Sequence, residues 1–342
     1  MIACVTGGNG YLASLLVKQL LEKGYIVNAT VRDPGNQAKV SHLLNLPGSE
    51  RLNLFLADLT VEGSFDDPIN GCDLVFHVAS PVLLFDSKDP ENEMIKPAIQ
   101  GTLNVLRACA KSKTVKRVVM TSSTAALNGR CRKIKDNIQP MTEECWSDVQ
   151  YLVSEKPEYW GYMTSKTLAE KEAWKFAAET QINLITVLPV IVTGPSLAPE
   201  LPHSVILTLS ILTGDESVLR TQQTITGHVP FVHVDDVCRA HIFLAEKESA
   251  SGRYICCAVD AGIAEVVKFL SNRYPQYCKA PTDLDDFPSE FRDVLSVEKL
   301  MKEGFTFKFG IEEIFDESVE YLKAKGLFLS DGKQSSTQYS SF

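Results

Sequence analysis

The sequence predicts an α/β fold: a doubly wound parallel sheet with helices on both faces, joined to a smaller, discontinuous C-terminal lobe. Short apolar strand patterns alternate with helical patterns in the first half of the 342 residues, as in repeated β-α-β units. The strand segments are continuous apolar runs, which is typical of strands buried on both faces. A glycine-rich turn joins the first strand to the first helix. Together these observations predict a ligand site beyond the carboxyl ends of the strands.

The first half supplies six predicted strands and three long helices. The first strand, Ile2–Val5, leads into a helix at Gly10–Lys23, which should end at Gly24 because glycine favours the helix C-cap. The other predicted strands are Tyr25–Val31, Asn53–Ala57, Leu74–Val78, Arg117–Thr121 and Leu184–Leu188, and the other helices are Pro97–Lys111 and Thr164–Glu179.

The pattern changes after Leu188, where several prolines crowd a short stretch. We expect residues 1–188, completed by about 228–258, to form a dinucleotide-binding domain, and residues 189–227 and 259–328 to form a substrate lobe. The polar, serine-rich residues 329–342 are predicted to be a disordered tail. Helices are expected at Ser204–Leu212 and Asp236–Lys247, and strands at Phe231–Val234 and Arg253–Ala258.

Composition narrows the class of protein. Apolar residues make up 44% and charged residues 23%, which are values of a folded globular chain. The net charge of −9 argues against general binding to nucleic acid or anionic membrane. Because no apolar run approaches the ~20 residues of a membrane span and no signal peptide is visible, we expect a cytoplasmic protein. We expect it to be a monomer or a weak homo-oligomer.

Cysteine and histidine usage predicts neither disulfides nor a metal site. The nine cysteines are odd in number and contain no Cys-x-x-Cys pair, so we expect reduced thiols in the core. The six histidines do not cluster with metal-ligand spacing. His77 and His233 are therefore interpreted as structural residues.

The first motif is Thr6-Gly7-Gly8-Asn9-Gly10-Tyr11-Leu12-Ala13. Gly7 permits a tight turn, Gly10 lets a pyrophosphate approach the backbone, and Ala13 lets the helix pack closely on the strand. The following helix start offers free N–H groups to phosphate. The order of strand, glycines and helix predicts dinucleotide binding, and no Gly-Lys-[Ser/Thr] follows to indicate a Walker loop.

The end of the second strand predicts which dinucleotide binds. Arg32 stands where a 2′-phosphate would be read, and Lys39 could add a second positive charge. These residues favour NADPH/NADP+ as the cofactor. Asp33, a carboxylate next to Arg32, leaves NAD open.

The candidate catalytic residues are Ser123, Tyr162 and Lys166. Tyr162 and Lys166 lie four residues apart and so share one face of a helix, where the lysine ammonium would lower the tyrosine pKa. Ser123 follows a buried strand and could hydrogen-bond a substrate oxygen beside Tyr162.

The glycine loop, Ser123 and the Tyr162/Lys166 pair, in this order, resemble the extended short-chain dehydrogenase/reductase superfamily, over Ile2 to about Leu327. In that family the fold is a Rossmann domain and Ser, Tyr and Lys form the catalytic group. The phrases Thr30-Val31-Arg32-Asp33-Pro34, Phe76-His77-Val78-Ala79-Ser80-Pro81 and Ser165-Lys166-Thr167-Leu168-Ala169-Glu170 are similar to plant flavonoid reductases. Residues 245–257 look most like anthocyanidin reductases, with dihydroflavonol 4-reductases and vestitone reductase as near relatives.

The resemblance implies an NADPH-dependent reductase of a small flavonoid, and it implies further site residues. Cofactor residues would be Thr6, Gly7, Asn9, Gly10, Tyr11, Leu12, Arg32, Lys39, Asp58, Leu59, Val78, Ala79, Ser80, Thr121, Ser122, Tyr162, Lys166 and Pro189. Substrate residues would be Ser80, Ser123, Asn128 and Tyr162.

Several alternatives stay open. Asn128 falls where dihydroflavonol 4-reductases carry a substrate-reading asparagine, so reduction of a 4-keto group is an alternative to reduction of an anthocyanidin. Residues 131–140 also depart from both relatives. An epimerase or dehydratase that recycles its cofactor is a more remote reading, as is a non-catalytic NADP sensor. The intact Ser123, Tyr162 and Lys166 argue against the sensor.

Overall fold

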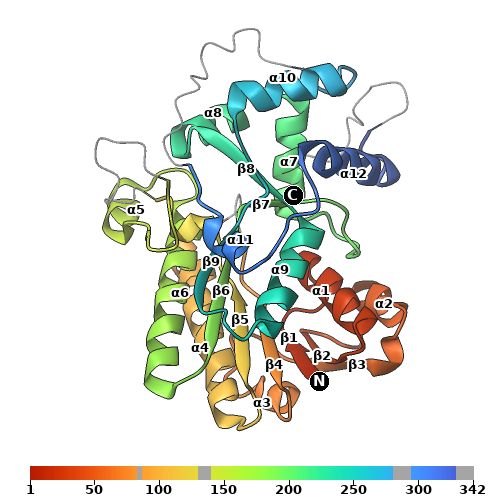
Figure 1. Ribbon diagram of the computed structural model, residues 1–342, viewed down its shortest axis with the longest axis vertical. Coiled ribbons are helices and arrows are strands. Elements are labelled where there is room, and N and C mark those ends of the chain that lie inside the picture. The colour runs from red at the N-terminus through yellow and green to blue at the C-terminus, as the bar shows by residue number, and fades with distance from the viewer. Residues whose placement is uncertain (83–86, 130–139, 280–293, 329–342) are drawn as a thin grey trace.

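The computed structural model describes residues 1–82, 87–129, 140–279 and 294–328 (Figure 1). Its larger sheet has seven strands in the order β3-β2-β1-β4-β5-β6-β9, and every neighbouring pair is parallel. This confirms the predicted doubly wound fold. The strands are β1 (Ile2–Val5), β2 (Ile26–Val31), β3 (Leu52–Leu56), β4 (Leu74–His77), β5 (Arg117–Thr121), β6 (Leu184–Pro189) and β9 (Gly252–Cys256).

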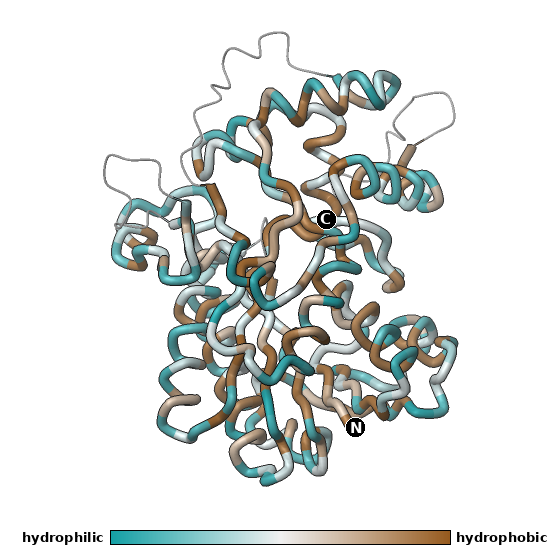
Figure 2. The backbone as a smooth tube through the Cα atoms, in the orientation of Figure 1, coloured by the Kyte–Doolittle hydropathy of each residue, from teal (hydrophilic) through white to brown (hydrophobic). Residues whose placement is uncertain are grey.

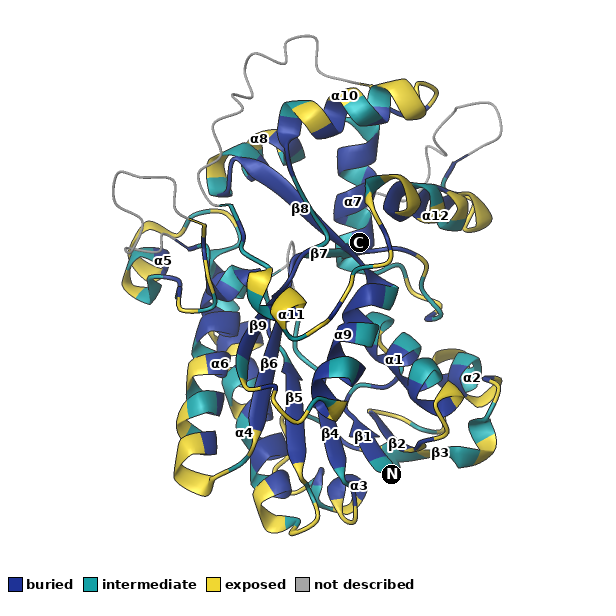
Figure 3. Cartoon of the chain, in the orientation of Figure 1, coloured by how far each residue is buried: buried dark blue, intermediate teal, exposed yellow. Residues whose placement is uncertain are grey.

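Helices cover both faces of this sheet. On one face, α1 (Tyr11–Glu22) and α9 (Val234–Glu246) pack on side chains such as Val5 and Val27. On the other, α3 (Asp66–Ile69), α4 (Lys96–Lys111) and α6 (Trp160–Thr180) pack on Cys4 and Val118. The two faces alternate along each strand, which explains the continuous apolar runs. Figure 3 shows most of these strands as buried, with the edge strand β3 half-buried to exposed, and Figure 2 shows hydrophilic residues on the outer sides of the helices.

A second sheet lies beyond the carboxyl ends of the large sheet (Figure 1). It pairs β8 (His228–His233) with β10 (Val259–Gly262) antiparallel and with β7 (Ile191–Thr193) parallel. A separate core, with Phe231 against Phe315 at 5.1 Å between ring centroids, joins it to surrounding helices. These helices are α7 (His203–Thr213), α8 (Glu216–Ile225), α10 (Ile263–Arg273) and α12 (Ile311–Ala324).

The small sheet corrects one detail of the sequence analysis. The strand expected at Phe231–Val234 begins at His228 and pairs in the small sheet, whereas β9 extends the large one. Residues 228–258 therefore do not all complete the large sheet. The division of the chain into two domains stays a prediction.

Several short elements were not predicted from the sequence. They are α2 (Gln37–Leu44), α5 (Val149–Glu155), α11 (Glu298–Lys302), α3, β7, β10, a π-helical turn at Glu91–Ile95 and 3-10 turns at Ser49–Arg51 and Thr124–Ala126. The longer helices α8, α10 and α12 were not predicted either. Helix α6 also begins at Trp160, four residues earlier than expected. Its N-cap, Tyr159, has φ = 60°, a left-handed conformation that ends the preceding turn.

The cysteines follow the sequence prediction. All eight cysteines among the described residues are buried free thiols, and Cys131 lies outside these residues. The predicted tail at 329–342 also lies outside them. Within the described ranges, no helix is both long enough and apolar enough to cross a membrane.

Candidate active site

The turn between β1 and α1 has the geometry of a phosphate-binding loop. Gly7 adopts φ = 68°, a conformation that favours glycine, and its N–H donates to Thr30 Oγ1 at 3.1 Å. A Cβ atom on Gly7 would lie 3.0 Å from the Cβ of Ala79, so a larger residue would push against the end of β4. No side chain of the described residues caps α1, and its first N–H groups are free for an anion.

The side chains around this turn are committed to the protein itself. Tyr11 donates its hydroxyl to the Gly194 carbonyl at 2.9 Å, and Leu12 packs against the core of the large sheet. Gly10 donates its N–H to the Gly7 carbonyl at 2.8 Å, and Asn9 is half-buried beside them. Tyr11 and Leu12 therefore offer main-chain N–H groups, rather than side chains, to a cofactor.

A buried hydrogen-bond chain fixes the ends of β1 and β4. Thr6 Oγ1 accepts the N–H groups of Val78 and Ala79, both at 3.0 Å. Its own proton must then point to Nδ1 of His77 at 3.1 Å, so Nε2 of His77 donates to Thr102 Oγ1 at 3.2 Å. Burial lowers the pKa of His77 to about 3, with Lys166 adding to the effect, so the ring stays neutral. These hydrogen bonds fix the main chain at Val78 and Ala79, where the cofactor is predicted to lie.

The residues predicted to read a 2′-phosphate are exposed. Arg32 follows directly on β2, and no hydrogen bond or ion pair within the described ranges occupies its guanidinium. Lys39 lies in α2, and its Nζ is 3.3 Å from Glu200 Oε1. The Asp33 carboxylate accepts the N–H of Gly35 at 2.9 Å, so this side chain faces the loop to which it belongs.

The edge expected to border an adenine is rigidly built. Asp58 Oδ1 accepts the N–H and the hydroxyl of Thr60 at 2.8 and 2.6 Å, and these bonds lower the pKa of Asp58. The Leu59 carbonyl accepts Nδ2 of Asn104 at 2.9 Å. A Cβ on Gly101 would lie 2.7 Å from Leu59, so this side chain packs directly on the α4 backbone.

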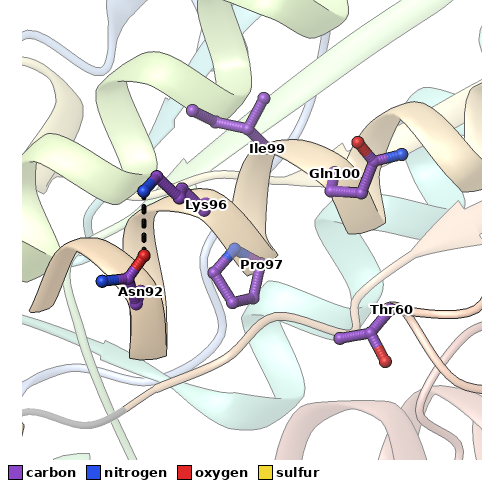
Figure 4. Close-up of a pocket in the computed structure, with 6 residues that line it drawn as sticks. All are labelled: Thr60, Asn92, Lys96, Pro97, Ile99 and Gln100. Carbon is purple, nitrogen blue, oxygen red and sulfur yellow. Dashed lines mark hydrogen bonds between the residues drawn. The ribbon is translucent and has the colours of Figure 1, made fainter. Parts of the chain in front are cut away.

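A surface pocket of about 470 Å³ opens beside this edge, between Thr60 and the start of α4 (Figure 4). Lys96 crosses it and donates to Asn92 Oδ1 at 2.8 Å. Its lining residues are Thr60, Asn92, Lys96, Pro97, Ile99 and Gln100, none of which the sequence analysis assigned to a site.

The three predicted catalytic residues come together. Ser123 follows the end of β5, and its hydroxyl is near enough to Tyr162 on α6 to act on the pKa of the tyrosine. Ser123 Oγ also accepts the N–H of Ala125 at 3.2 Å, which fixes its direction. Nζ of Lys166, one helical turn from Tyr162, lies 5.7 Å from the tyrosine ring centroid.

The protonation states in this group suit a proton donor. Burial raises the pKa of Tyr162 above its usual range, and the nearby Ser123 hydroxyl lowers it only in part. The expected lowering by Lys166 is therefore outweighed by burial in this structure. Burial also lowers the pKa of Lys166 to about 8, against the opposing effect of Glu170. At neutral pH the tyrosine carries its proton and the lysine its charge.

The remaining predicted residues surround this group. Thr121 donates its hydroxyl to His241 Nε2 at 2.8 Å, because Nδ1 of His241 donates to a backbone carbonyl. Pro189 ends β6, and its carbonyl accepts the hydroxyl of Thr124. Ser80 is half-buried, with its hydroxyl toward the Pro81 carbonyl. Asn128 Oδ1 is buried and has no hydrogen-bond partner among the described residues.

Sequence analysis assigned no role to a buried ion pair beneath the catalytic residues. Glu170, four residues after Lys166, accepts hydrogen bonds from Nε and Nη2 of Arg253 at 2.8 and 3.1 Å. It also accepts the hydroxyl of Ser122 at 2.6 Å, so the side chain of this predicted cofactor residue points into the protein. The sequence does contain a signal for Glu170, because this residue continues the four-residue spacing that separates Tyr162 from Lys166.

This arrangement defines a class of enzyme. A phosphate-binding turn at the switch point of a parallel sheet, with Ser, Tyr and Lys side chains at the same edge, is the site of a nicotinamide-dependent oxidoreductase. The described residues hold no cluster of three or more His, Cys, Asp or Glu side chains that could bind a metal ion.

Comparison with known proteins places the chain within this class. The chain belongs to the NAD dependent epimerase/dehydratase family, whose model matches residues 3–257. It is 58% identical to an anthocyanidin reductase ((2S)-flavan-3-ol-forming) of Vitis vinifera, over 95% of this chain and 96% of that protein. It is 47% identical to a dihydroflavonol 4-reductase of Arabidopsis thaliana, over 94% of this chain and 82% of that protein. The chain is thus an NAD(P)-dependent reductase related to plant flavonoid reductases.

Solved structures agree with this assignment. Vestitone reductase from alfalfa superposes with a TM-score of 0.80 at 38% identity, over 95% of this chain and 99% of that chain. The yeast methylglyoxal/isovaleraldehyde reductase Gre2, complexed with NADPH, superposes with a TM-score of 0.78 at 25% identity, again over 95% and 99%. These similarities confirm the predicted fold.

Proposed function

We propose that the protein reduces an anthocyanidin to a flavan-3-ol with NADPH. The observation that carries this proposal is that Ser123, Tyr162 and Lys166 come together at the sheet edge that also holds the phosphate-binding turn. The 58% identity to an anthocyanidin reductase supports the choice of substrate.

NADPH is the proposed cofactor because of the charge at the end of β2. Arg32 is exposed and free of ion pairs within the described ranges, so its guanidinium can turn to a 2′-phosphate. Asp33 accepts one hydrogen bond from its own loop, at Oδ1. The yeast relative that is complexed with NADPH is consistent with this choice.

The chemistry sets what the protein must supply. A flavylium cation becomes a neutral flavan-3-ol by taking up two hydrides and one proton, so two cofactor molecules are consumed in each conversion. The reduced nicotinamide supplies the hydrides when bound. The protein must orient the substrate, exclude water and deliver the single proton at the right point.

The three catalytic side chains divide this work. Tyr162 holds a proton at neutral pH and is the general acid. Ser123, next to the tyrosine, orients the substrate oxygen. The Lys166 ammonium would hold the cofactor ribose through its hydroxyls, and it favours negative charge at Tyr162 as the proton leaves. We further propose that residues 189–227 and 259–328 supply the wall that covers a flat substrate.

A second candidate is reduction of a 4-keto group in a dihydroflavonol or flavanone. Asn128 favours it, because its buried amide oxygen lacks a partner and could accept a hydrogen bond from a substrate hydroxyl. This reaction needs one hydride at C4 and one proton, which Tyr162 would give to the developing alkoxide. The same three residues serve both reactions, so the residues that surround the bound substrate must set the substrate preference.

The test is NADPH oxidation by the purified protein with cyanidin, dihydroquercetin and a flavanone, followed by identification of each product. We expect cyanidin to yield a flavan-3-ol with two NADPH consumed for each product molecule. Asn128→Leu, which removes the amide at nearly constant volume, should lower turnover of dihydroquercetin more than turnover of cyanidin.

Two outcomes would count against the proposal. Reduction of only the 4-keto substrates would replace the first candidate with the second. Tightly bound NAD in the purified protein, with turnover of sugar nucleotides, would instead support an epimerase or dehydratase.

A further inference from the structure

The catalytic helix α6 carries a third functional position beyond Tyr162 and Lys166. Glu170 follows Lys166 by four residues, so the three side chains lie along one helix face. The Glu170 carboxylate is fully buried, which is costly for a charge unless it is paired and hydrogen-bonded.

Glu170 meets that condition with five hydrogen bonds from four elements. Arg253 of β9 binds both carboxylate oxygens, at 2.8 and 3.1 Å, in a bidentate ion pair. The hydroxyl of Ser122, at the end of β5, donates at 2.6 Å, and that of Thr186, in β6, at 2.7 Å. The indole of Trp174, one turn further along α6, donates at 3.3 Å.

Arg253 is itself held on its other side. Its Nη1 donates to the carbonyls of Glu143 and Cys145, both at 2.6 Å. Its guanidinium stacks on the ring of Trp146 at 3.6 Å. The Glu170–Arg253 pair therefore connects α6 to three neighbouring strands and to the segment before α5. Both charged groups of the pair are also hydrogen-bonded to other residues.

This network contacts the catalytic group at two points. Ser122 precedes Ser123, so the bond from Ser122 to Glu170 sets the direction in which the chain delivers the Ser123 hydroxyl. The negative charge of Glu170 favours the charged form of the buried Lys166. We propose that Glu170, held by Arg253, is a positioning residue that aligns Tyr162 with Ser123 and keeps the Lys166 ammonium charged.

Three other titratable or charged groups lie around Lys166 and Glu170, and they determine in which direction the pKa of Lys166 should shift. Tyr162 lies on α6, His77 on β4 and Arg253 on β9, and Glu170 and Lys166 face each other along the helix. His77 and Tyr162 both stay neutral near pH 7, since their pKa values are shifted down and up. If Glu170 lost its charge, no carboxylate would offset the repulsion between the Arg253 and Lys166 cations. The lysine should then lose its proton at lower pH.

Glu170→Gln tests the charge, because glutamine keeps the shape and one acceptor oxygen. Lysine labelled with ¹⁵N at Nζ reports the titration of Lys166 directly, with its signal assigned through Lys166→Met. We expect the titration midpoint to fall by about one pH unit from the wild-type value near 8. Glu170→Asp should return it toward the wild-type value. A wild-type midpoint in a folded Glu170→Gln variant would overturn the role in charge.

Ser122→Ala tests the alignment, because it removes one hydroxyl and leaves the ion pair intact. Since the proposal rests on the proposed reductase activity here, the readout is kcat with the flavonoid that the wild-type protein reduces. We expect kcat to fall about tenfold, with the KM for NADPH changed less than twofold, because a lost hydrogen bond and a shifted Ser123 affect the reacting geometry. Unchanged kcat would overturn the alignment. This variant also decides the question if Glu170→Gln does not fold.

Asp236→Asn is the matched control. Asp236 is also a fully buried carboxylate with an arginine partner, Arg239, but it binds the N–H groups of Lys308 and Phe309, away from α6. It should lower thermal stability without moving the Lys166 titration. If it moves that titration as far as Glu170→Gln does, the effect is general destabilisation and the proposal fails. If wild-type protein reduces no flavonoid, the proposed function fails, whereas the titration still tests Glu170.

Discussion

Two parts of the candidate site are built in opposite ways. The catalytic wall of Ser123, Tyr162 and Lys166 is half-buried to buried, and its side chains are fixed by one another and by the Glu170 network. The outer corner with Arg32 and Lys39 is exposed, and it offers charge rather than fixed geometry. Proton transfer requires donor and acceptor groups that are aligned within hydrogen-bond reach, whereas recognition of a phosphate at the surface requires mainly a positive charge that can reach it.

We expect the largest loss of activity from a change in the catalytic wall of Ser123, Tyr162 and Lys166. Tyr162→Phe removes the proton-donating hydroxyl beside Ser123, while the ring and its packing remain. General acid catalysis is worth roughly 10² to 10⁴ in rate, so we expect kcat for a ketone substrate to fall by that factor. NADPH binding, measured by fluorescence titration, should change little. Turnover within a few-fold of wild type would show that Tyr162 is not the acid.

The second prediction concerns pH and sharpens the role of the wall. The lowered pKa of Lys166, about 8, means that its ammonium is present below pH 8 and is lost as the pH rises through that value. Tyr162 keeps its proton over this range because its pKa is raised. We expect kcat/KM, which reports groups of the free enzyme, to fall about tenfold for each pH unit above 8.

Lys166→Arg is the control for that profile, since a guanidinium stays charged throughout the range. Its activity should be lower overall, but the decline near pH 8 should disappear. Flavonoid phenols also titrate, and their contribution is the same for both proteins. A decline that persists at pH 8 in this variant would assign it to the substrate or to another group.

How far the sequence alone predicts such a site depends on whether its parts are local. The strands of the large sheet follow from short segments and lie close to their predicted ranges, and the glycine turn and the Tyr162/Lys166 spacing are local motifs as well. The meeting of Ser123 with Tyr162 also follows, because carboxyl ends of parallel strands share one sheet edge.

Three features could not be predicted because they depend on long-range partners. Arg253 lies 83 residues from Glu170 in the chain, and nothing local marks it as the partner of a buried carboxylate. Strand β8 has the apolar pattern of a strand of the large sheet, yet it pairs with β7 and β10. Burial is a third such case: it raises the pKa of Tyr162, which the spacing to Lys166 alone had predicted to fall.

The smallest predicted effect lies at the outer corner, where two cations of equal charge differ in their surroundings. Arg32 has no ion-pair partner within the described ranges, whereas Lys39 lies 3.3 Å from Glu200. Hydrogen bonds to charged groups are worth about 1.5–3 kcal/mol, and exposure places Arg32 at the low end of that range. We therefore expect Arg32→Ala to raise the KM for NADPH about tenfold and to leave the KM for NADH nearly unchanged.

Lys39→Ala should raise the KM for NADPH by only about twofold, because Glu200 already neutralises much of its charge. Glu200→Gln frees Lys39 and should lower the KM for NADPH slightly, which is the opposite sign. In both variants kcat should stay at the wild-type value, since neither residue contacts Ser123, Tyr162 or Lys166 among the described contacts. If Arg32→Ala raises the KM values for NADH and NADPH equally, Arg32 does not read the 2′-phosphate. The outer corner would then act on a part that NADH and NADPH share rather than select between them.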